Sequence, residues 1–314
     1  MPIRVKNPGM FSTIQDLGRY GYSHLGISPA GAADRLSLRI ANLLAGNPEN
    51  APALEMTLLG ATLEFEERRI VALAGADCDA KVGTSSVRPR ETVEVPAGGV
   101  LKCGGMKTGA RSYLAVQGGF DVPAVMGSAA TDVRGRFGGL EGRRLKAGDV
   151  LPVLDGQTGR MWRLKPGALD AVYRHDVVRV TRGAQQEWFG PEAFEVLFSC
   201  PYSISDQSDR TGLRLKGEPL RPREQSQLLT DGIPLGAMQV PQDGQPIILF
   251  VDQQTTGGYP KIANVIMADM HHIGQLRPHE QVRFHEVSIP QAIMLLKQQE
   301  RWLQDAFVPR SQRY

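Results

Sequence analysis

The chain has 314 residues, and its 36 lysines and arginines against 33 aspartates and glutamates give a formal net charge of +3. This length suits about two domains of roughly 150 residues each. The small charge excludes nucleic-acid binding that relies on charge alone, because neutralising phosphates takes a dense basic patch. Thirty-five glycines and 21 prolines in a chain with 41% apolar residues predict many short strands joined by turns.

Hydropathy and cysteine usage bear on the compartment. The longest uninterrupted apolar run, Ile247–Val251, is far below the ~18 residues that span a bilayer, and the first residues lack the apolar region of an export signal. The cysteines, Cys78, Cys103 and Cys200, are odd in number and show no C-x-x-C spacing. We therefore expect small buried hydrophobic residues rather than disulfides or a zinc site, in a cytoplasmic protein.

The first half of the chain is predicted to be rich in strands. The glycine-rich segment 7–29 indicates turns and short strands. A helix is expected over Asp34–Ala45, with Asp34 as its cap and Gly46 ending it. The apolar runs Ile70–Gly75 and Ser112–Gln117 predict buried strands.

Two similar segments, Val95–Leu101 and Leu145–Leu151, are each predicted to form a turn that leads into a short strand, which is common in β-barrels. Periodic apolar residues are few over Gln157–Ala168, so we place a domain boundary there. The expected organisation is an N-terminal β-barrel lobe over residues 1–160 and a C-terminal lobe over residues 161–314.

The second half begins with a predicted strand at Asp176–Thr181 and a short helix at Pro191–Phe198. Strands are then expected at Gly212–Leu215, Gly236–Val240 and Pro246–Asp252. A helix is predicted to open at Pro260 and to end at Gly274, with one apolar face made of Ile262, Val265, Ile266, Met270 and Ile273.

The last predicted helix begins at Ser288, which has the capping-box spacing with Gln291. The tripeptide Ile-Ala-Asn occurs at Ile40–Asn42 and again at Ile262–Asn264, each time in a predicted helix. Internal duplication and chance remain equal explanations of this repeat.

The stretch Ile247–Lys261, IILFVDQQTTGGYPK, is the first candidate site. Its two glycines allow a ligand to approach the backbone closely. The predicted helix start offers free N–H groups, with Lys261 in the first turn. The stretch therefore predicts a site for a carboxylate or phosphate, with an ordinary strand–turn–helix link as the alternative. The polar residues that the strand end brings to one rim are Asp252, Gln253, Gln254, Thr255 and Thr256.

Two further polar segments are weaker candidates. Ser205–Gly212 carries Arg210, whose planar fork could bind a carboxylate, although a solvated surface loop is the simpler interpretation. In Leu228–Val240, Asp231-Gly232 signals a hairpin turn and Gln239 lies at the end of the following strand.

Several chemistries lack their sequence signals. Lys107-Thr108 is the nearest approach to a P-loop, but the glycines that the motif needs are missing, and no G-x-G-x-x-G or G-x-S-x-G occurs in the required context. The adjacent His271 and His272 point to different faces of a helix, so no metal site is expected.

Three blocks of residues match a known family. The chain resembles the allophanate hydrolase subunit 2 family, also described as the biotin-dependent carboxyltransferase family, and within it the KipA-like C subunits of 5-oxoprolinases. The blocks are Ile14–Arg19 continuing through Gly26, Pro29, Gly31, Asp34, Asn42 and Glu55; Gly109–Pro123; and Ser208–Gly212 continuing through Val240-Pro241 and Asp252 to Gln254–Lys261.

The resemblance implies a mainly β protein with a few helices, built as a cyclophilin-like β-barrel in two lobes. It also implies one component of an ATP-dependent enzyme that opens the lactam 5-oxoproline to L-glutamate. In that enzyme a KipI-like B subunit shares in phosphorylating the substrate, and an A subunit completes the hydrolysis. We assign catalytic roles to Lys261, Arg210 and Asp252. The expected substrate-binding residues are Gln239, Gln254, Thr255, Thr256, Gly257, Gly258 and Tyr259.

Two alternatives remain open at the level of sequence. Relatives use the same module to move a carboxyl group from carboxybiotin to an amide such as urea. Biotin is not expected on this chain, because Met106-Lys107-Thr108 lacks the second methionine that flanks a biotinylated lysine. A third possibility is a regulatory protein that antagonises a kinase inhibitor by binding it.

Overall fold

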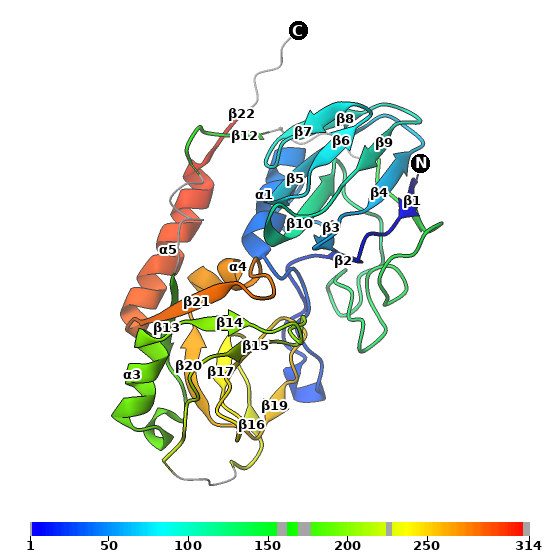
Figure 1. Cartoon of the computed structure of the whole chain (residues 1–314). Helices are drawn as coiled ribbons and strands as arrows, with labels where there is room; N and C mark the ends of the chain where they lie inside the picture. Colours follow the sequence, from blue (N-terminus) through cyan, green and yellow to red (C-terminus); the bar gives the residue numbers. More distant parts are fainter. Residues whose placement is uncertain (1, 156–161, 169–176, 224–227, 310–314) are drawn as a thin grey trace. The chain divides into compact units, whose positions relative to one another are not determined.

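The computed structural model describes residues 2–155, 162–168, 177–223 and 228–309. The chain forms two compact units, each assembled from separate segments (Figure 1). The predicted boundary between residues 160 and 161 lies outside the described residues. Unit 1 comprises Met1–Arg19, Ala30–Ala168 and Asp305–Tyr314, and unit 2 comprises Tyr20–Pro29 and Leu169–Gln304.

Unit 1 contains two antiparallel sheets of short strands. One sheet has the order β11-β1-β4-β9-β6-β7 and the other the order β2-β3-β10-β5-β8. The first sheet consists of β11 (Val150–Leu151), β1 (Ile3–Asn7), β4 (Thr62–Phe65), β9 (Val100–Lys102), β6 (Ala80–Val82) and β7 (Ser85–Val87). The second consists of β2 (Phe11–Gln15), β3 (Ala53–Thr57), β10 (Thr108–Val116), β5 (Arg69–Asp77) and β8 (Thr92–Val95). A further pair joins β12 (Trp162–Leu164) to β22 (Phe307–Pro309).

Helix α1 (Arg35–Ala45) packs against β5 and β10. The side chain of Asp34 accepts a hydrogen bond from the backbone N–H of Ser37 at 2.9 Å, which satisfies one of the free donors of the first turn. Gly46 ends the helix with a φ of 79°, a left-handed conformation that favours glycine. The helix, its cap and its stop are confirmed as the sequence predicts them.

The first block of the family resemblance stabilises the loops of unit 1. Asp16 accepts hydrogen bonds from the hydroxyl of Ser128 at 2.6 Å and from the backbone N–H of Ala129 at 2.7 Å. Glu55, which is buried, accepts from Tyr113 Oη at 2.7 Å. These two carboxylates therefore connect strands and loops of unit 1.

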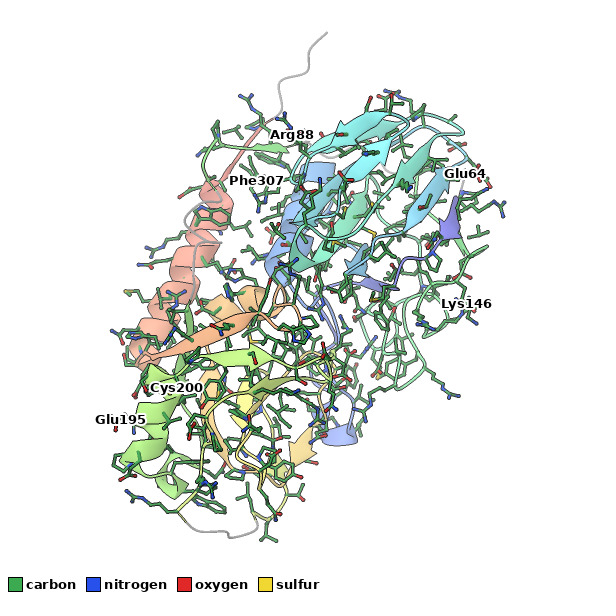
Figure 2. All side chains as sticks on the ribbon, in the orientation of Figure 1. Glu64, Arg88, Lys146, Glu195, Cys200 and Phe307 are labelled. Atoms are coloured by element: carbon green, nitrogen blue, oxygen red, sulfur yellow. The ribbon has the colours of Figure 1, made fainter. Side chains whose placement is uncertain are left out.

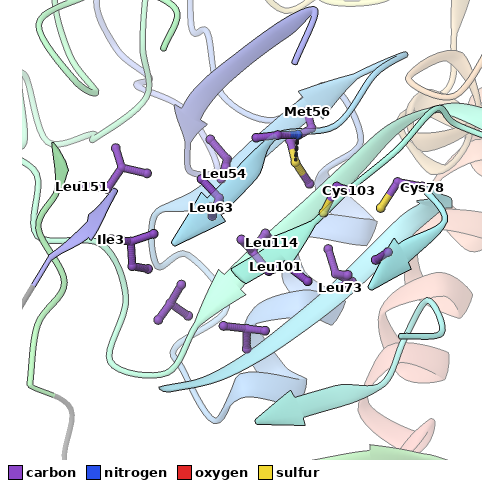
Figure 3. Packing of buried hydrophobic residues seen from close by; sticks show 14 of the residues in the cluster. Ile3, Leu54, Met56, Leu63, Leu73, Cys78, Leu101, Cys103, Leu114 and Leu151 are labelled. Atoms are coloured by element: carbon purple, nitrogen blue, oxygen red, sulfur yellow. Dashed lines mark hydrogen bonds between the residues drawn. The ribbon is translucent and has the colours of Figure 1, made fainter. Parts of the chain in front are cut away.

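The core of unit 1 contains two of the three cysteines. Cys78 and Cys103 are each 2% exposed and lie next to each other in this core, although they are 25 positions apart in the sequence (Figure 3). Cys200 is half-buried and follows α3 (Pro191–Ser199) in unit 2 (Figure 2). All three are free thiols; Cys78 and Cys103 are buried as expected, whereas Cys200 is only half-buried.

Unit 2 is a closed seven-strand barrel with the order β13-β20-β17-β18-β15-β14-β21. This architecture, mainly β with few helices, confirms the expected fold class. The barrel strands are β13 (Val177–Arg182), β20 (Lys261–Val265), β17 (Ala237–Gln239), β18 (Ile247–Leu249), β15 (Gly212–Lys216), β14 (Tyr202–Ile204) and β21 (Gln281–Glu286).

The helix predicted to open at Pro260 is wrong. Residues Lys261–Val265 form strand β20, which pairs with β13 on one side and β17 on the other. Four of its five residues are buried, because neighbouring strands and the barrel interior cover them. Apolar residues at Ile262, Ala263 and Val265 suit a short strand buried on both faces as well as one face of a helix. Helical structure begins only with the 3₁₀ turn η3 (Met267–Asp269) and the short α4 (Met270–Ile273).

This correction also affects the suggested repeat. Ile40–Asn42 lies within α1, whereas Ile262–Asn264 lies within a strand. The two copies of the tripeptide therefore occupy different secondary structures.

The last helix, α5 (Ile289–Asp305), begins as predicted. The backbone N–H of Ser288 donates to Gln291 Oε1 at 2.8 Å, and the Gln291 N–H donates back to Ser288 Oγ at 3.4 Å, which makes a capping box. Leu303 is buried whereas Ile293 is 50% exposed. No described helix is long and apolar enough to cross a membrane.

Candidate functional site

The candidate site lies where two connections of the barrel meet. The connection after β18 carries the short strand β19 (Thr256–Gly257), and the connection before β17 carries β16 (Asp231–Gly232). The two strands pair with Asp231 opposite Gly257 and Gly232 opposite Thr256. Two segments that are separate candidates in the sequence therefore form one structure.

Lys261 is the buried cation of this site. Its side chain is 2% exposed, and its Nζ lies 2.9 Å from Asp231 Oδ2. The Asp231 side chain is 52% exposed, so it covers the ammonium group from the solvent side. A buried ammonium group needs a carboxylate and hydrogen-bond partners to offset its lost hydration.

The backbone position of Lys261 differs from the prediction. As the first residue of β20, it is paired with Gln239 of β17 and provides no helix N-terminus for an anion. An anion at this position would therefore be attracted by the Lys261 ammonium group and not by a helix N-terminus.

Gln185 completes the surroundings of Lys261, and the sequence patterns did not predict it. Its Oε1 accepts the backbone N–H of Lys261 at 3.2 Å, and its own backbone N–H donates to the Lys261 carbonyl at 3.2 Å. Its side chain also contributes, as the smallest of several causes, to lowering the pKa of Asp231. Gln185 follows β13, which pairs with β20, and no local motif signals this role.

The hydrogen bond from Lys261 is the main reason that the pKa of Asp231 is lowered from its usual value, followed by a bond from the Gly232 N–H. Because the pKa is lowered, the site stabilises the ionised form of the Asp231 carboxylate. The sequence predicted Asp231 only as a turn residue.

Carboxamide groups gather around Gly257. A Cβ at this glycine would lie 2.9 Å from Gln239 Nε2 and 3.2 Å from Gln254 Nε2. Gln239 is buried and its Nε2 donates to the Tyr259 carbonyl at 3.4 Å, whereas Gln254 is exposed. The structure thus brings together three predicted substrate-binding residues, Gln239, Gln254 and Gly257. The space between the two carboxamides is open because Gly257 has no side chain to fill it.

Arg210 and Asp252 form a second buried ion pair. Arg210 Nε lies 2.8 Å from Asp252 Oδ2 and Nη2 lies 3.0 Å from Oδ1, with both side chains 8% exposed. The Asp252 N–H also donates to the Arg210 carbonyl at 2.9 Å. This two-point contact anchors the start of the connection that carries the remaining site residues.

That connection is held by further bonds to the β16 segment. Gln253, buried, donates from Nε2 to the Ile233 carbonyl at 2.9 Å, and the Ile233 N–H donates to the Thr255 carbonyl at 3.0 Å. The remaining predicted residues lie on the same connection, where Thr256, Gly258 and Tyr259 are exposed and Thr255 is half-buried.

The histidines lie elsewhere in unit 2. His271 is buried beside Gln299, at 3.3 Å between Nδ1 and Nε2, and His272 is half-buried. Within the described ranges, no three histidine, cysteine, aspartate or glutamate side chains gather as a metal site would require. The chemistry on offer is one buried ammonium group with a carboxylate, carboxamides and exposed hydroxyls, a set that suits a polar, anionic amide.

The chain is similar in sequence to proteins of known function. The chain is 41% identical to the C subunit of the 5-oxoprolinase of Escherichia coli (strain K12), over 96% of both chains. It is 30% identical to the urea amidolyase of Saccharomyces cerevisiae, over 95% of this chain but only 17% of that protein.

Solved structures share the fold. The crystal structure of the Kluyveromyces lactis urea amidolyase matches with a TM-score of 0.91 and 28% identity, over 99% of this chain and 21% of that chain. The crystal structure of TTHA0988 matches with a TM-score of 0.79 and 34% identity, over 90% of this chain and 56% of that chain. Residues 25–286 match the family described as carboxyltransferase domain, subdomain A and B, and the chain belongs to that family.

Proposed function

We propose that this chain is the C subunit of an ATP-dependent 5-oxoprolinase, which opens 5-oxoproline to L-glutamate. The match to the Escherichia coli protein of that name carries the proposal, because it runs over 96% of both chains. A second match, to the C subunit of the Haemophilus influenzae 5-oxoprolinase, has 39% identity over 93% of both. The urea amidolyases, by contrast, match this chain over only a small part of a much longer protein.

The chemistry explains why such a complex would use ATP. Resonance in a lactam makes its carbonyl carbon a poor electrophile. Transfer of the terminal phosphoryl group of ATP to the carbonyl oxygen removes that resonance. ADP is released in that transfer. Water then attacks the carbon, and the C–N bond breaks as the nitrogen takes up a proton, which leaves an acyl phosphate. A second water hydrolyses the acyl phosphate to the carboxylate of glutamate and inorganic phosphate. Positive groups and N–H donors around the transferring phosphoryl group stabilise such a step.

The described residues fit separate parts of this task. Lys261 supplies the positive charge, and the carboxamides of Gln239 and Gln254 supply donors and acceptors for the lactam. Arg210 and Asp252 keep the start of the connection in place through their two hydrogen bonds. The residues that give the substrate-facing surface are Thr255, Thr256, Gly258 and Tyr259.

The remaining parts of the proposal concern the complex. We assign substrate phosphorylation to this chain together with the B subunit and the final hydrolysis to the A subunit, with ATP as a substrate of the complex. No biotin is attached to this chain, and the complex is cytoplasmic. Because no nucleotide-binding fingerprint occurs in the sequence, ATP binds either without these motifs or partly on another chain, and the family resemblance favours the shared site.

The test is reconstitution from purified proteins. We expect conversion of 5-oxoproline to glutamate when the A and B subunits and ATP are all present, and none from this chain alone. ATP-dependent turnover by the isolated chain would rule out a shared site. Absence of turnover from the full set would rule out the proposed activity.

Carboxyl transfer is the second candidate, favoured by the family match and by the TM-score of 0.91 with a urea amidolyase. It makes the opposite prediction about biotin. Activity would depend on bicarbonate and a biotinylated protein, and avidin would inhibit it. We expect the reconstituted complex to be insensitive to avidin, and strong inhibition would reverse the order of the two candidates.

A further inference from the structure

The ion pair between Lys261 and Asp231 joins two groups held with very different rigidity. Lys261 lies in a barrel strand between two paired neighbours, and its side chain is 2% exposed. Asp231 lies in a two-residue strand, and its side chain is 52% exposed. The ammonium group therefore has a fixed position, whereas rotation of the Asp231 side chain would release it to solvent.

We propose that Asp231 is a displaceable counter-ion, which leaves Lys261 when the anionic group of a substrate takes its place. This inference rests on the proposed function and extends it. The site selects an amide that carries a carboxylate over an amide that carries none. Asp231 thereby becomes a specificity-determining residue of the reaction.

Charge balance explains the selectivity. The buried ammonium group of Lys261 needs an anionic partner, and an entering carboxylate or phosphoryl oxygen restores the pairing that Asp231 gives up. A neutral amide cannot restore it, so such a ligand must bind beside an intact Lys261–Asp231 pair. The carboxamide of Gln185 accepts the backbone N–H of Lys261 through its oxygen, so its NH2 group offers the incoming anion a second donor.

The exit of Asp231 has a small structural cost. Its Oδ1 bonds the N–H of the next residue, Gly232, at 2.7 Å, so this interaction involves only the local turn. The pairing of β16 with β19 uses backbone groups and does not depend on the Asp231 carboxylate. The side chain can therefore turn away while the connection keeps its shape.

The decisive experiment measures binding to the full chain by calorimetry with three probes. These are 5-oxoproline, pyrrolidinone (the same lactam without the carboxylate) and inorganic phosphate. In Asp231→Asn the competing negative charge is gone but the size is kept. We expect 5-oxoproline and phosphate to bind about fivefold more tightly, which corresponds to the loss of one partly exposed ion pair. Pyrrolidinone binding should not change.

Two variants control this result. Glu195→Gln removes a negative charge from the exposed side of α3 and should leave all three affinities unchanged (Figure 2). Lys261→Met removes the cation and should abolish the binding of both anions. Circular dichroism and melting temperature establish that Asp231→Asn and Lys261→Met are folded.

The possible outcomes separate the alternatives. Three outcomes would each overturn the inference. The first is weaker binding of 5-oxoproline by Asp231→Asn, and the second is an equal change in the binding of pyrrolidinone. The third is no binding of either anion by wild type or by Asp231→Asn. Tightening for phosphate alone would overturn the carboxylate selectivity and assign the position to a phosphoryl group. The reconstituted complex could fail to turn over 5-oxoproline while the affinities change as expected. This result would reject the proposed enzyme activity but still support the counter-ion role of Asp231.

Discussion

The guanidinium group of Arg210 and the carboxylate of Asp252 meet through two hydrogen bonds of 2.8 and 3.0 Å, in a place where both side chains are 8% exposed. A pair removed from water in this way costs much to break, because removing either residue leaves the other as a buried charge without its oppositely charged neighbour. The pair connects residues 42 positions apart and positions the start of the connection that carries the candidate site.

We expect Arg210→Met to lower the free energy of unfolding by about 3–5 kcal/mol, because it leaves Asp252 charged and buried. Urea denaturation of the full chain measures this loss. Arg68→Met is the matched control, since Arg68 pairs with Glu94 on the surface with side chains 68% and 50% exposed. It should change the unfolding free energy far less than Arg210→Met does, because solvent screens an exposed pair. Equal effects of the two substitutions would contradict the buried role of Arg210.

Gln254→Ala separates a binding role from a structural one, because this side chain is exposed. We expect an unchanged melting temperature and a turnover of the reconstituted complex that falls by roughly ten- to a hundredfold, since a donor to the lactam is lost. Gln298→Ala removes an exposed carboxamide from α5 and serves as the control. Wild-type turnover in Gln254→Ala would remove this residue from the site.

Gly257→Ala tests the space between the carboxamides. The added methyl group would lie 2.7 Å from Ile233 Cδ1 and 2.9 Å from Gln239 Nε2, so the neighbours would have to shift. We expect kcat/KM for 5-oxoproline to fall by roughly tenfold or more, because small displacements of positioning groups are costly to rate. Gly232→Ala, in the paired strand β16, meets nothing within 4 Å and should behave like wild type. Similar losses in both variants would indicate a general distortion of the two strands.

Asp231 also makes stability depend on pH. Its pKa is lowered in the folded chain, first by the hydrogen bond from Lys261, so the folded state favours the ionised carboxylate more than the unfolded state does. The resulting stabilisation is present above the unfolded pKa of about 3.9 and is lost as the pH falls through the folded value.

Comparison of wild type with Asp231→Asn shows this directly. The melting temperature of wild type should exceed that of the variant at pH 7, and the difference should shrink as the pH falls below about 4. A difference that stays constant from pH 7 to pH 3 would mean that the carboxylate charge has no part in it.

Local sequence signals predicted much of the fold. The Asp34 cap, the Gly46 stop and the Ser288–Gln291 capping box each involve residues within a few positions of one another, and all three are present. The strands at Ile70–Gly75 and Ser112–Gln117 are confirmed as parts of β5 and β10, because their apolar runs are long enough to need burial on both faces.

The same signals failed at Lys261–Val265, where the spacing of apolar residues fits a helix and a buried strand equally well. Pairing decided the outcome: β20 lies between β13 and β17, whose residues are about 80 and 25 positions away in the chain. No window of local sequence contains those partners, so local periodicity could not distinguish the two structures.

The sequence by itself determined the mainly β class, the capped helices and the segment that carries most of the candidate site, since these depend on composition and short-range patterns. Only the tertiary structure decided that Lys261 is a buried strand residue, that Asp231 is its counter-ion and that Gln185 bonds the backbone of Lys261. The physical reason is that an ion pair inside a barrel depends on which strands are neighbours. Closure of the barrel sets that order through contacts between residues far apart in the chain.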